Sequence, residues 1–548
     1  MIGGILAGQA IAKAGVKCVF TLCGGHVAPI YIGLQMSGVR IIDTRHEAAA
    51  AHAADAWGRL TGIPGVAIVT AGPGVTNAVT GIANAFQAES PMVLIGGKVG
   101  MTRMDQGSLQ EMDQLSLVSS ITKWRACVYE TARIPEYIAR AFHVANTGRK
   151  GPVYLEIPID ILLKQDEPRH AGPRTPLPDE GASQADVYMV EEVARLIAHA
   201  ERPVIVGGAS LHWDGAAQQL DEFARATAVP VYLNGLGRGH LPHDHPNFFA
   251  HTRKHALAKA DVVVLIGAEA DFRLGYGRGI NKDAKIIKIE PDAFKVGFNV
   301  DPERVLVGNA RFILRQLTLA WRGRSDAAPK TAWLAEMREM EAAAWEALRE
   351  EMESDIYPVN PNRFGAEIAK AIDKDTIIIG DGGNIVAAVS KVLPLTSPRQ
   401  WMDPGKFGCL GVGMPFALAA QAAFPEKKVL VVFGDGSVGF NGFEIDSAVR
   451  QNLPIVCVVG NDAAWTQIRA AQIESAGEEF AAATLLAPTR YNQFAVGLGA
   501  DGYHVEKAED IAPTIRLAFE RRRPAMINVM VDAALNGRGV SYIAAGLS

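Results

Sequence analysis

Cysteine is scarce in this chain of 548 residues. The five cysteines are odd in number and scattered, and no two of them stand in a CxxC spacing. A disulfide framework or a structural zinc site would need such paired spacings, so we expect these thiols to be reduced core residues. The expected compartment is therefore the cytoplasm, where thiols stay reduced.

The sequence also lacks long apolar runs and a large charge of either sign. No span of 18 apolar residues occurs, and the apolar N-terminus has no basic leader and is broken by Lys13 and Lys17. These features predict neither a membrane span nor a secretory leader. A formal net charge of −5 gives no reason to expect nucleic acid or an anionic membrane as a partner, so we expect small-molecule ligands.

Short apolar runs alternate with helical patterns along most of the chain. This alternation is typical of α/β domains with doubly wound parallel sheets, and the chain is too long for a single core. We therefore expect three such domains, at residues 1–165, 187–322 and 361–535. The polar, proline-rich residues 161–186 are interpreted as a linker, and residues 323–360 as a connector with a charged helix.

The middle third has two glycine-containing turns that follow predicted strands. They are the pair Gly207 and Gly208, and residues 271–279, which read DFRLGYGRG. Such turns could cradle a nucleotide such as FAD or ADP, but no complete GxGxxG is present. Tight turns with an exposed arginine remain the equal alternative.

Residues 434–465, GDGSVGFNGFEIDSAVRQNLPIVCVVGNDAAW, are the most informative stretch. They follow an apolar run at 427–433 that predicts a buried parallel strand, so Gly434, Asp435 and Gly436 fall at a strand's C-terminal end. The glycines allow close approach of a diphosphate, Asp435 offers a hard oxygen ligand, and Ser437 can donate to a phosphate. A helix at about 442–451 and a second strand then bring Asp462 to the same edge.

This stretch resembles the cofactor motif of thiamine diphosphate enzymes, in which GDG is followed at this spacing by two asparagines. The resemblance implies that Mg²⁺ is held by Asp435, Asp462 and the backbone carbonyl of Ala464. The second asparagine of the motif is Asp462 here. A carboxylate is still a hard oxygen ligand, but it adds a negative charge beside the diphosphate and puts metal affinity in question.

Two stretches of the first third extend the resemblance. With the C-terminal motif, they are similar to the acetolactate synthase, benzaldehyde lyase and 2-hydroxyacyl-CoA lyase branch of the thiamine diphosphate enzymes. The two stretches are RHEAAAAHAADAWGR and GVAIVTAGPGVTNAVTGIANAF. An acidic residue in a first helical turn often only stabilises the helix dipole. The resemblance instead makes Glu47 the residue that hydrogen-bonds N1′ of the aminopyrimidine, which requires a carboxyl in an apolar setting. Glu47 then acts across a subunit boundary, which implies at least a homodimer and is consistent with a homotetramer.

The same resemblance assigns further cofactor contacts. Leu410 is implied to support the bent cofactor, with Gly408 beside it. The remaining implied contacts are Gly383, Asn384, Gly434, Asp435, Gly436, Ser437, Asp462, Ala464 and Trp465.

The substrate pocket is implied by matches to different members of the branch. His26 stands where benzaldehyde lyase has an active-site histidine and acetolactate synthases do not, and Gln110 stands where both have a glutamine. No two histidines are adjacent, unlike pyruvate decarboxylases, which makes simple decarboxylation less favoured. The other expected pocket residues are Leu109, Trp465, Thr466 and Gln467.

The expected activity is a thiamine diphosphate- and Mg²⁺-dependent carbon–carbon lyase or carboligase acting on 2-hydroxyacyl or 2-hydroxyketone substrates, with Glu47, His26 and Gln110 as catalytic residues. One alternative is acetolactate synthesis from pyruvate. Another is a catalytically silent cofactor-binding subunit, motivated by the altered motif at Asp462.

Overall fold

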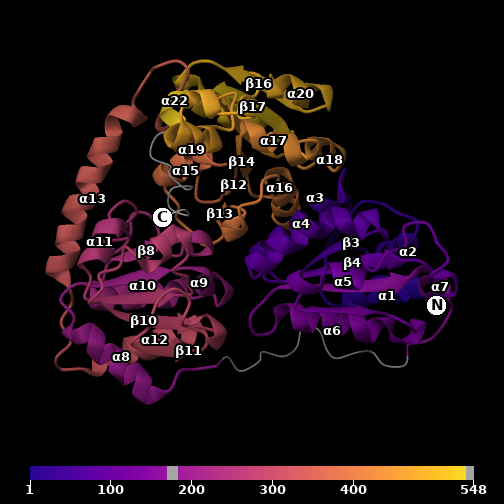
Figure 1. Ribbon diagram of the computed structural model, residues 1–548, viewed down its shortest axis with the longest axis horizontal. Helices are drawn as coiled ribbons and strands as arrows, with labels where there is room; N and C mark the ends of the chain where they lie inside the picture. The colour runs from indigo at the N-terminus through magenta and orange to yellow at the C-terminus, as the bar shows by residue number, and fades with distance from the viewer. Residues whose placement is uncertain (169–182, 538–548) are drawn as a thin grey trace.

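Three parallel β-sheets form the body of the protein, one in each third of the chain (Figure 1). The computed structural model describes residues 1–168 and 183–537. The expected fold class, three doubly wound α/β domains, is confirmed. Most of the expected linker at 161–186 lies outside the described residues, and its first residues belong to helix α7 (Ile159–Leu163).

The N-terminal sheet has the strand order β2-β1-β3-β4-β6-β5, with every neighbouring pair parallel. The chain passes from β1 outward to β2 and then crosses to β3, so connections diverge between β1 and β3, where α/β sheets bind ligands. The strands are β1 (Cys18–Thr21), β2 (Arg40–Asp43), β3 (Gly65–Val69), β4 (Met92–Lys98), β5 (Trp124–Cys127) and β6 (Pro152–Pro158). The other helices are α1 (Gly3–Lys13), α2 (Ala28–Met36), α3 (Glu47–Thr61), α4 (Pro73–Gln87), α5 (Gln114–Leu117) and α6 (Ile134–Asn146).

The C-terminal sheet repeats this topology, with the order β13-β12-β14-β15-β17-β16. Its strands are β12 (Ile377–Asp381), β13 (Trp401–Met402), β14 (Val429–Gly434), β15 (Val456–Asn461), β16 (Asp501–Val505) and β17 (Ala525–Met530). Its helices are α14 (Pro361–Ala371), α15 (Asn384–Val392), α16 (Gly413–Ala423), α17 (Asp435–Asn441), α18 (Glu444–Arg450), α19 (Thr466–Ala476), α20 (Tyr491–Gly497), α21 (Ile511–Arg521) and α22 (Ala533–Asn536).

The central sheet has five strands in the order β11-β10-β9-β7-β8. They are β7 (Pro203–Gly207), β8 (Val231–Leu233), β9 (Val262–Ile266), β10 (Lys285–Glu290) and β11 (Arg304–Val307). The surrounding helices are α8 (Val187–His199), α9 (Ala209–Trp213), α10 (Ala217–Thr227), α11 (Arg253–Lys259) and α12 (Ala310–Gly323). The long helix α13 (Thr331–Met352) runs along the outside from this domain to the C-terminal one (Figure 1). Its Trp333, Leu334 and Met337 are buried, as a packing stripe requires.

The N-terminal and C-terminal domains share one apolar core. Helices α3 and α4 pack between the N-terminal sheet and α16 of the C-terminal domain (Figure 1). The alanine-rich sequence of α3 permits this close approach on several sides. One ion pair is buried in the contact: Arg59 pairs with Asp55 at 2.6 Å and lies over the ring of Phe416.

The segment after β14 differs from the sequence interpretation. The helix expected at about 442–451 is present as α18 (Glu444–Arg450), but a further helix, α17, precedes it from Asp435 and was not expected. Glycines at 436 and 439 lower the intrinsic helix propensity of α17, so its existence depends on packing of residues such as Val438 into the core. In the described parts of the chain, none of the helices combines the length and the apolar character needed to cross a membrane.

Candidate active site

Four polar side chains gather at the C-terminal edge of the N-terminal sheet. Glu47 follows β2, His26 follows β1, Thr70 follows β3, and Gln110 comes from the segment after β4. These four strands are neighbours and parallel, so their C-terminal ends lie side by side at one edge.

His26, Thr70 and Gln110 form one hydrogen-bonded chain. The His26 Nδ1 and Thr70 Oγ1 atoms are 3.2 Å apart, and the Thr70 hydroxyl donates to Gln110 Oε1 at 3.1 Å. Burial lowers the pKa of His26 below its usual 6.5, so the imidazole is neutral at pH 7. Sequence reasoning missed Thr70; its position directly after a predicted strand was the available signal.

Glu47 is the first residue of α3, and only 6% of its surface is exposed. Its Oε2 atom accepts a hydrogen bond from Asn77 Nδ2 of α4 at 2.9 Å. Asn77, which sequence reasoning did not single out, therefore holds the carboxylate in one orientation.

A buried amide supports the loop that contains Gln110. Gln114 accepts from the backbone N–H of Gly72 at 2.6 Å and donates to the Gly97 carbonyl at 3.0 Å. Gly72 and Gln110 both have positive φ angles, of 57° and 64°, and their backbones touch. A side chain at position 72 would collide with Gln110, so this glycine is required for the approach.

The predicted residues of the C-terminal third line a single cavity of about 580 Å³. They come from the loops after β12, β13, β14 and β15, again at the C-terminal edge of adjacent strands. The members are Gly383, Asn384, Gly408, Leu410, Gly434, Asp435, Gly436, Ser437, Asp462, Ala464, Trp465, Thr466 and Gln467.

Two carboxylates in this cavity are suited to a divalent cation. Asp435 Oδ2 is buried without a hydrogen-bond partner, and Asp462 Oδ2 accepts from Asn536 Nδ2 at 2.7 Å. Burial and the nearby charge of Asp462 raise the pKa of Asp435 to about 7, and burial also raises the pKa of Asp462. A cation between them would relieve both effects, so these residues fit Mg²⁺. Within residues 1–168 and 183–537, no three His, Cys, Asp or Glu side chains form a metal cluster of their own.

Glycines shape the wall that would face a diphosphate. A Cβ atom at Gly383 would collide with Gln467, and one at Gly436 would collide with the Trp465 ring. The Ser437 hydroxyl donates to the carbonyl oxygens of Asp381 and Gly434, at 2.6 and 2.8 Å, so a phosphate contact would require this hydroxyl to rotate. The cradle therefore consists of backbone and small residues, as close approach of a diphosphate demands.

Asp381 anchors the loop that carries Leu410. Its carboxylate is fully buried and accepts backbone N–H groups from Gly411 at 3.1 Å and from Gly413 at 2.7 Å. Burial raises the pKa of Asp381 to about 7. Sequence reasoning missed this role, although Asp381 is the acidic residue of the GDGGN stretch.

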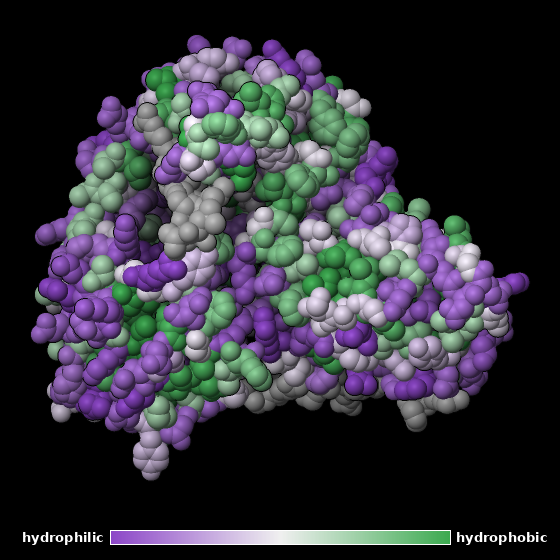
Figure 2. Space-filling model, viewed as in Figure 1, coloured by the Kyte–Doolittle hydropathy of each residue, from purple (hydrophilic) through white to green (hydrophobic). Residues whose placement is uncertain are grey.

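The two groups of candidate residues do not meet within one chain. None of the N-terminal candidates lines the cavity that contains Asp435, and Leu109 is 79% exposed. Apolar side chains gather on the face where the N-terminal and C-terminal domains meet (Figure 2). Large exposed apolar residues of these two domains include Leu109, Phe440 and Phe443.

The two predicted nucleotide turns of the middle third differ in the free space beside them. Residues of the 271–279 turn line a cavity of about 740 Å³, whereas the Gly207–Gly208 turn lies beside little free space. The space next to Gly208 and Gly267 is only about 60 Å³. Lys295 lines this space and pairs with Glu89 of the N-terminal domain and with Glu269 at 2.6 Å. Ligand sites for nucleotides are several-fold larger, so the space beside Gly208 does not hold FAD or ADP in this arrangement.

Comparison with known proteins completes the description of the site. The chain matches the thiamine pyrophosphate enzyme family in three regions: the N-terminal TPP binding domain at residues 3–117, the central domain at 190–317 and the C-terminal TPP binding domain at 381–529. It is 34% identical to 2-hydroxyacyl-CoA lyase 2 of Bos taurus, over 95% of this chain and 89% of the relative. It is 33% identical to the human 2-hydroxyacyl-CoA lyase 2, over 96% and 90%. It is also 33% identical to the acetolactate synthase large subunit IlvG of Mycobacterium tuberculosis, over 98% and 96%.

Proposed function

Because this chain belongs to the thiamine diphosphate enzymes, we propose that it cleaves or forms the carbon–carbon bond beside the hydroxyl of a 2-hydroxyacyl thioester or a 2-hydroxyketone. The observation that carries this proposal is the hydrogen-bonded chain of His26, Thr70 and Gln110. When a 2-hydroxyacyl substrate is cleaved, the hydroxyl proton must leave as its carbon becomes an aldehyde. A neutral imidazole is a suitable acceptor for that proton.

Thiamine diphosphate, when bound, supplies an electron sink next to the substrate carbonyl. Asp435, Asp462 and the Ala464 carbonyl would hold Mg²⁺, and the glycine wall would face the diphosphate. Leu410 would support the ring system from a loop that is anchored by Asp381.

Glu47 would hold a proton shared with the aminopyrimidine of the cofactor. Its burial and the fixed hydrogen bond from Asn77 support this assignment. Gln110 would orient the substrate hydroxyl or carbonyl, since Thr70 already connects its amide to His26.

The active unit that we propose is a homodimer or a larger assembly such as a tetramer. Glu47 and Asp435 lie in separate sites of one chain, so a second copy must bring them together. Mixing Glu47→Gln and Asp435→Asn chains tests this. Random pairing would give heterodimers with one intact site, and activity would recover to roughly a quarter of wild type. If the mixture stays inactive after verified subunit exchange, each chain works alone or the assignments are wrong.

Acetolactate synthesis is the second candidate, supported by the similarity to the mycobacterial enzyme. The two reactions are separated by parallel assays with a 2-hydroxyacyl-CoA and with pyruvate. Aldehyde release from the thioester supports the lyase, whereas faster formation of acetolactate from pyruvate overturns it.

A silent cofactor-binding subunit remains the candidate from another class, because of Asp462. Hydrogen–deuterium exchange at C2 of bound thiamine diphosphate decides this point. Binding without accelerated exchange would favour a silent subunit.

A flavin in the middle domain would require Lys295 to leave its two carboxylates. An absorbance spectrum near 450 nm tests for one. We also propose a cytoplasmic location, supported by five thiols in the free state.

A further inference from the structure

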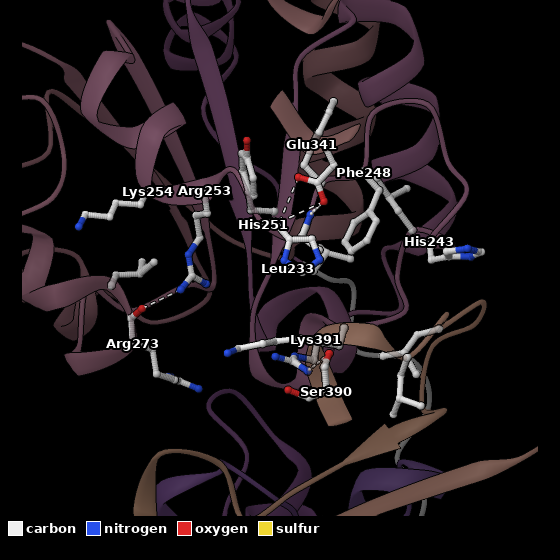
Figure 3. Close-up of a pocket in the computed structure, with 18 of the residues that line it drawn as sticks. Leu233, His243, Phe248, His251, Arg253, Lys254, Arg273, Glu341, Ser390 and Lys391 are labelled. Carbon is white, nitrogen blue, oxygen red and sulfur yellow. Dashed lines mark hydrogen bonds between the residues drawn. The ribbon is translucent and has the colours of Figure 1, made fainter. Parts of the chain in front are cut away.

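A second large cavity, of about 740 Å³, lies between the central domain, helix α13 and helix α15 (Figure 3). It adjoins the cofactor cavity, because several residues line both spaces. The shared residues are Arg238, Arg253, Arg273, Ala387 and Ser390.

The lining of this second cavity is strongly basic. It contains five arginine and lysine side chains and a single carboxylate, that of Glu341. Glu341 is already occupied, because it accepts backbone N–H groups from Ala250 at 2.9 Å, from His251 at 3.1 Å and from Thr252 at 3.2 Å. A positive cavity in a chain of formal charge −5 is a local concentration of charge that favours an anionic ligand.

Three of these cations have no carboxylate partner in the described part of the chain. Arg253 donates only to the backbone carbonyl of Arg273, at 3.0 Å, whereas Lys254 and Lys391 are exposed and make no ion pair. Arg253 and Lys391 approach the space from opposite sides, one from the central domain and the other from α15 (Figure 3). Arg273 differs from them, since its guanidinium is bound to Asp271 at 2.6 Å. Burial and the neighbouring arginines lower the pKa of Arg253, so an anion beside it would be stabilising.

The rest of the lining is apolar and aromatic. His251 packs edge-on against Trp345 with ring centroids 4.6 Å apart, and Phe248 and Leu233 lie nearby (Figure 3). Such a surface can accept a flat heterocyclic base while the cations hold phosphates.

The basic cavity and the cofactor cavity are close together, because helix α15 lines both. Asn384 at the start of α15 lines the cofactor cavity, and Lys391 near its end lines the basic cavity. Lys391 is seven positions beyond Asn384 in the helix, which corresponds to a rise of roughly 10 Å. A ligand with a long flexible arm can therefore lie in both cavities at once.

We propose that the basic cavity binds the phosphorylated nucleotide end of a coenzyme A thioester, whose acyl end extends into the cofactor cavity. This inference rests on the proposed lyase function and deepens it, since it selects a thioester over a simple 2-hydroxyketone. A free nucleotide such as ADP has the same chemistry, so the experiment distinguishes the two sources.

The first measurement is calorimetric titration of the cofactor-loaded enzyme with free coenzyme A and with 3′-dephospho-coenzyme A. The Lys254→Gln/Lys391→Gln variant changes only exposed side chains, and it should weaken coenzyme A binding by about tenfold. The matched control is Lys282→Gln/Lys374→Gln, two exposed lysines outside the cavity, which should bind as wild type does. Arg253→Gln provides an independent test and should weaken binding at least as much. Equal affinity in all variants would overturn the proposal.

The second measurement separates failure of the site from failure of the proposed reaction. With a 2-hydroxyacyl-CoA, the double variant should raise KM by about tenfold with kcat nearly unchanged, and added salt should reduce the difference. If the enzyme cleaves the thioester but KM is unaffected, the lyase function stands and the cavity assignment is wrong. If coenzyme A binds through Lys254 and Lys391 but no thioester is cleaved, the cavity assignment stands and the lyase proposal fails. Activation by ADP that does not compete with the thioester would identify an effector site and overturn the substrate-tail assignment.

Discussion

The N-terminal and C-terminal domains have the same six-stranded topology but place different chemistry at the same edge. At the N-terminal edge, Glu47, His26 and Gln110 are groups that can hold or orient a proton. At the C-terminal edge, glycines and the carboxylates Asp435 and Asp462 line a cavity whose chemistry would suit a metal and a diphosphate. The comparison shows that topology decides where a site lies, whereas the loops after the strands decide what the site does.

The largest expected effect is that of a substitution at Glu47, which should slow the chemical step without weakening cofactor binding. The Glu47→Gln variant keeps the size and the contact with Asn77 but cannot share a proton in the same way. We expect kcat to fall by about 1,000-fold while thiamine diphosphate affinity changes little. Turnover, C2 proton exchange and a cofactor titration measure the three quantities. The exposed Glu201→Gln serves as the control, and unchanged C2 exchange in the Glu47 variant would contradict the assignment.

The reverse pattern is expected at Asp435. The Asp435→Asn variant removes the carboxylate oxygen that has no partner in the cavity. Mg²⁺-dependent thiamine diphosphate affinity should fall on the order of 100-fold, with most of kcat recovered at saturating cofactor. Fluorescence quenching by cofactor at several Mg²⁺ concentrations checks this. If kcat stays low when the cofactor is saturating, Asp435 contributes to the chemical step and not only to cofactor binding, which would contradict the assignment.

A smaller effect is expected at His26, and it should depend on pH. Burial keeps the pKa of His26 below 6.5, so the neutral imidazole is protonated, and kcat/KM lost, only as pH falls below that value. The His26→Ala variant should lose about 10- to 100-fold in kcat and lose this acid limb. Thr70→Val, which breaks the chain to Gln110 and keeps the side-chain volume, should have an intermediate effect. An acid limb that persists in His26→Ala would assign the titration to another group.

The smallest effect concerns Asp462, the departure from the family motif. In the cofactor-free protein the pKa of Asp435 is about 7, above its ordinary value of 3.8, so the folded state holds a proton that the unfolded state has lost. Stability should therefore fall as pH rises from about 4 to 7. Asp462→Asn removes one of the two charges and should stabilise the apoprotein at pH 8 by roughly 1 kcal/mol, with little change at pH 4.

Thermal unfolding of the cofactor-free protein at both pH values tests the Asp462 prediction. The exposed Asp375→Asn is the control. Equal stabilisation at both pH values would show that charge repulsion is not the cause.

The C-terminal residues that the family resemblance assigns to the cofactor and the substrate pocket all line one space, and their roles there stay predictions. Asp381, Asn77 and Thr70 were missed because each acts indirectly. Each forms a hydrogen bond to another segment of the chain and so fixes the position of a residue there. Such contacts join segments distant in sequence, and no local pattern reports them. The basic cavity was found only in part: the 271–279 turn that lines it was named from the sequence, but its lysine and arginine partners were not, because Arg253 and Lys391 are 138 positions apart in the numbering.

The sequence by itself determined the three α/β domains, the cofactor family and the residues at the strand ends, because apolar runs and glycine-rich turns are local patterns. Only the tertiary structure decided that Asn77 and Thr70 hold the N-terminal candidates in place, that Lys295 lines the space beside Gly208, and that unpaired cations adjoin the cofactor cavity. Charge, burial and free space depend on which segments pack together, and packing is a property of the whole fold.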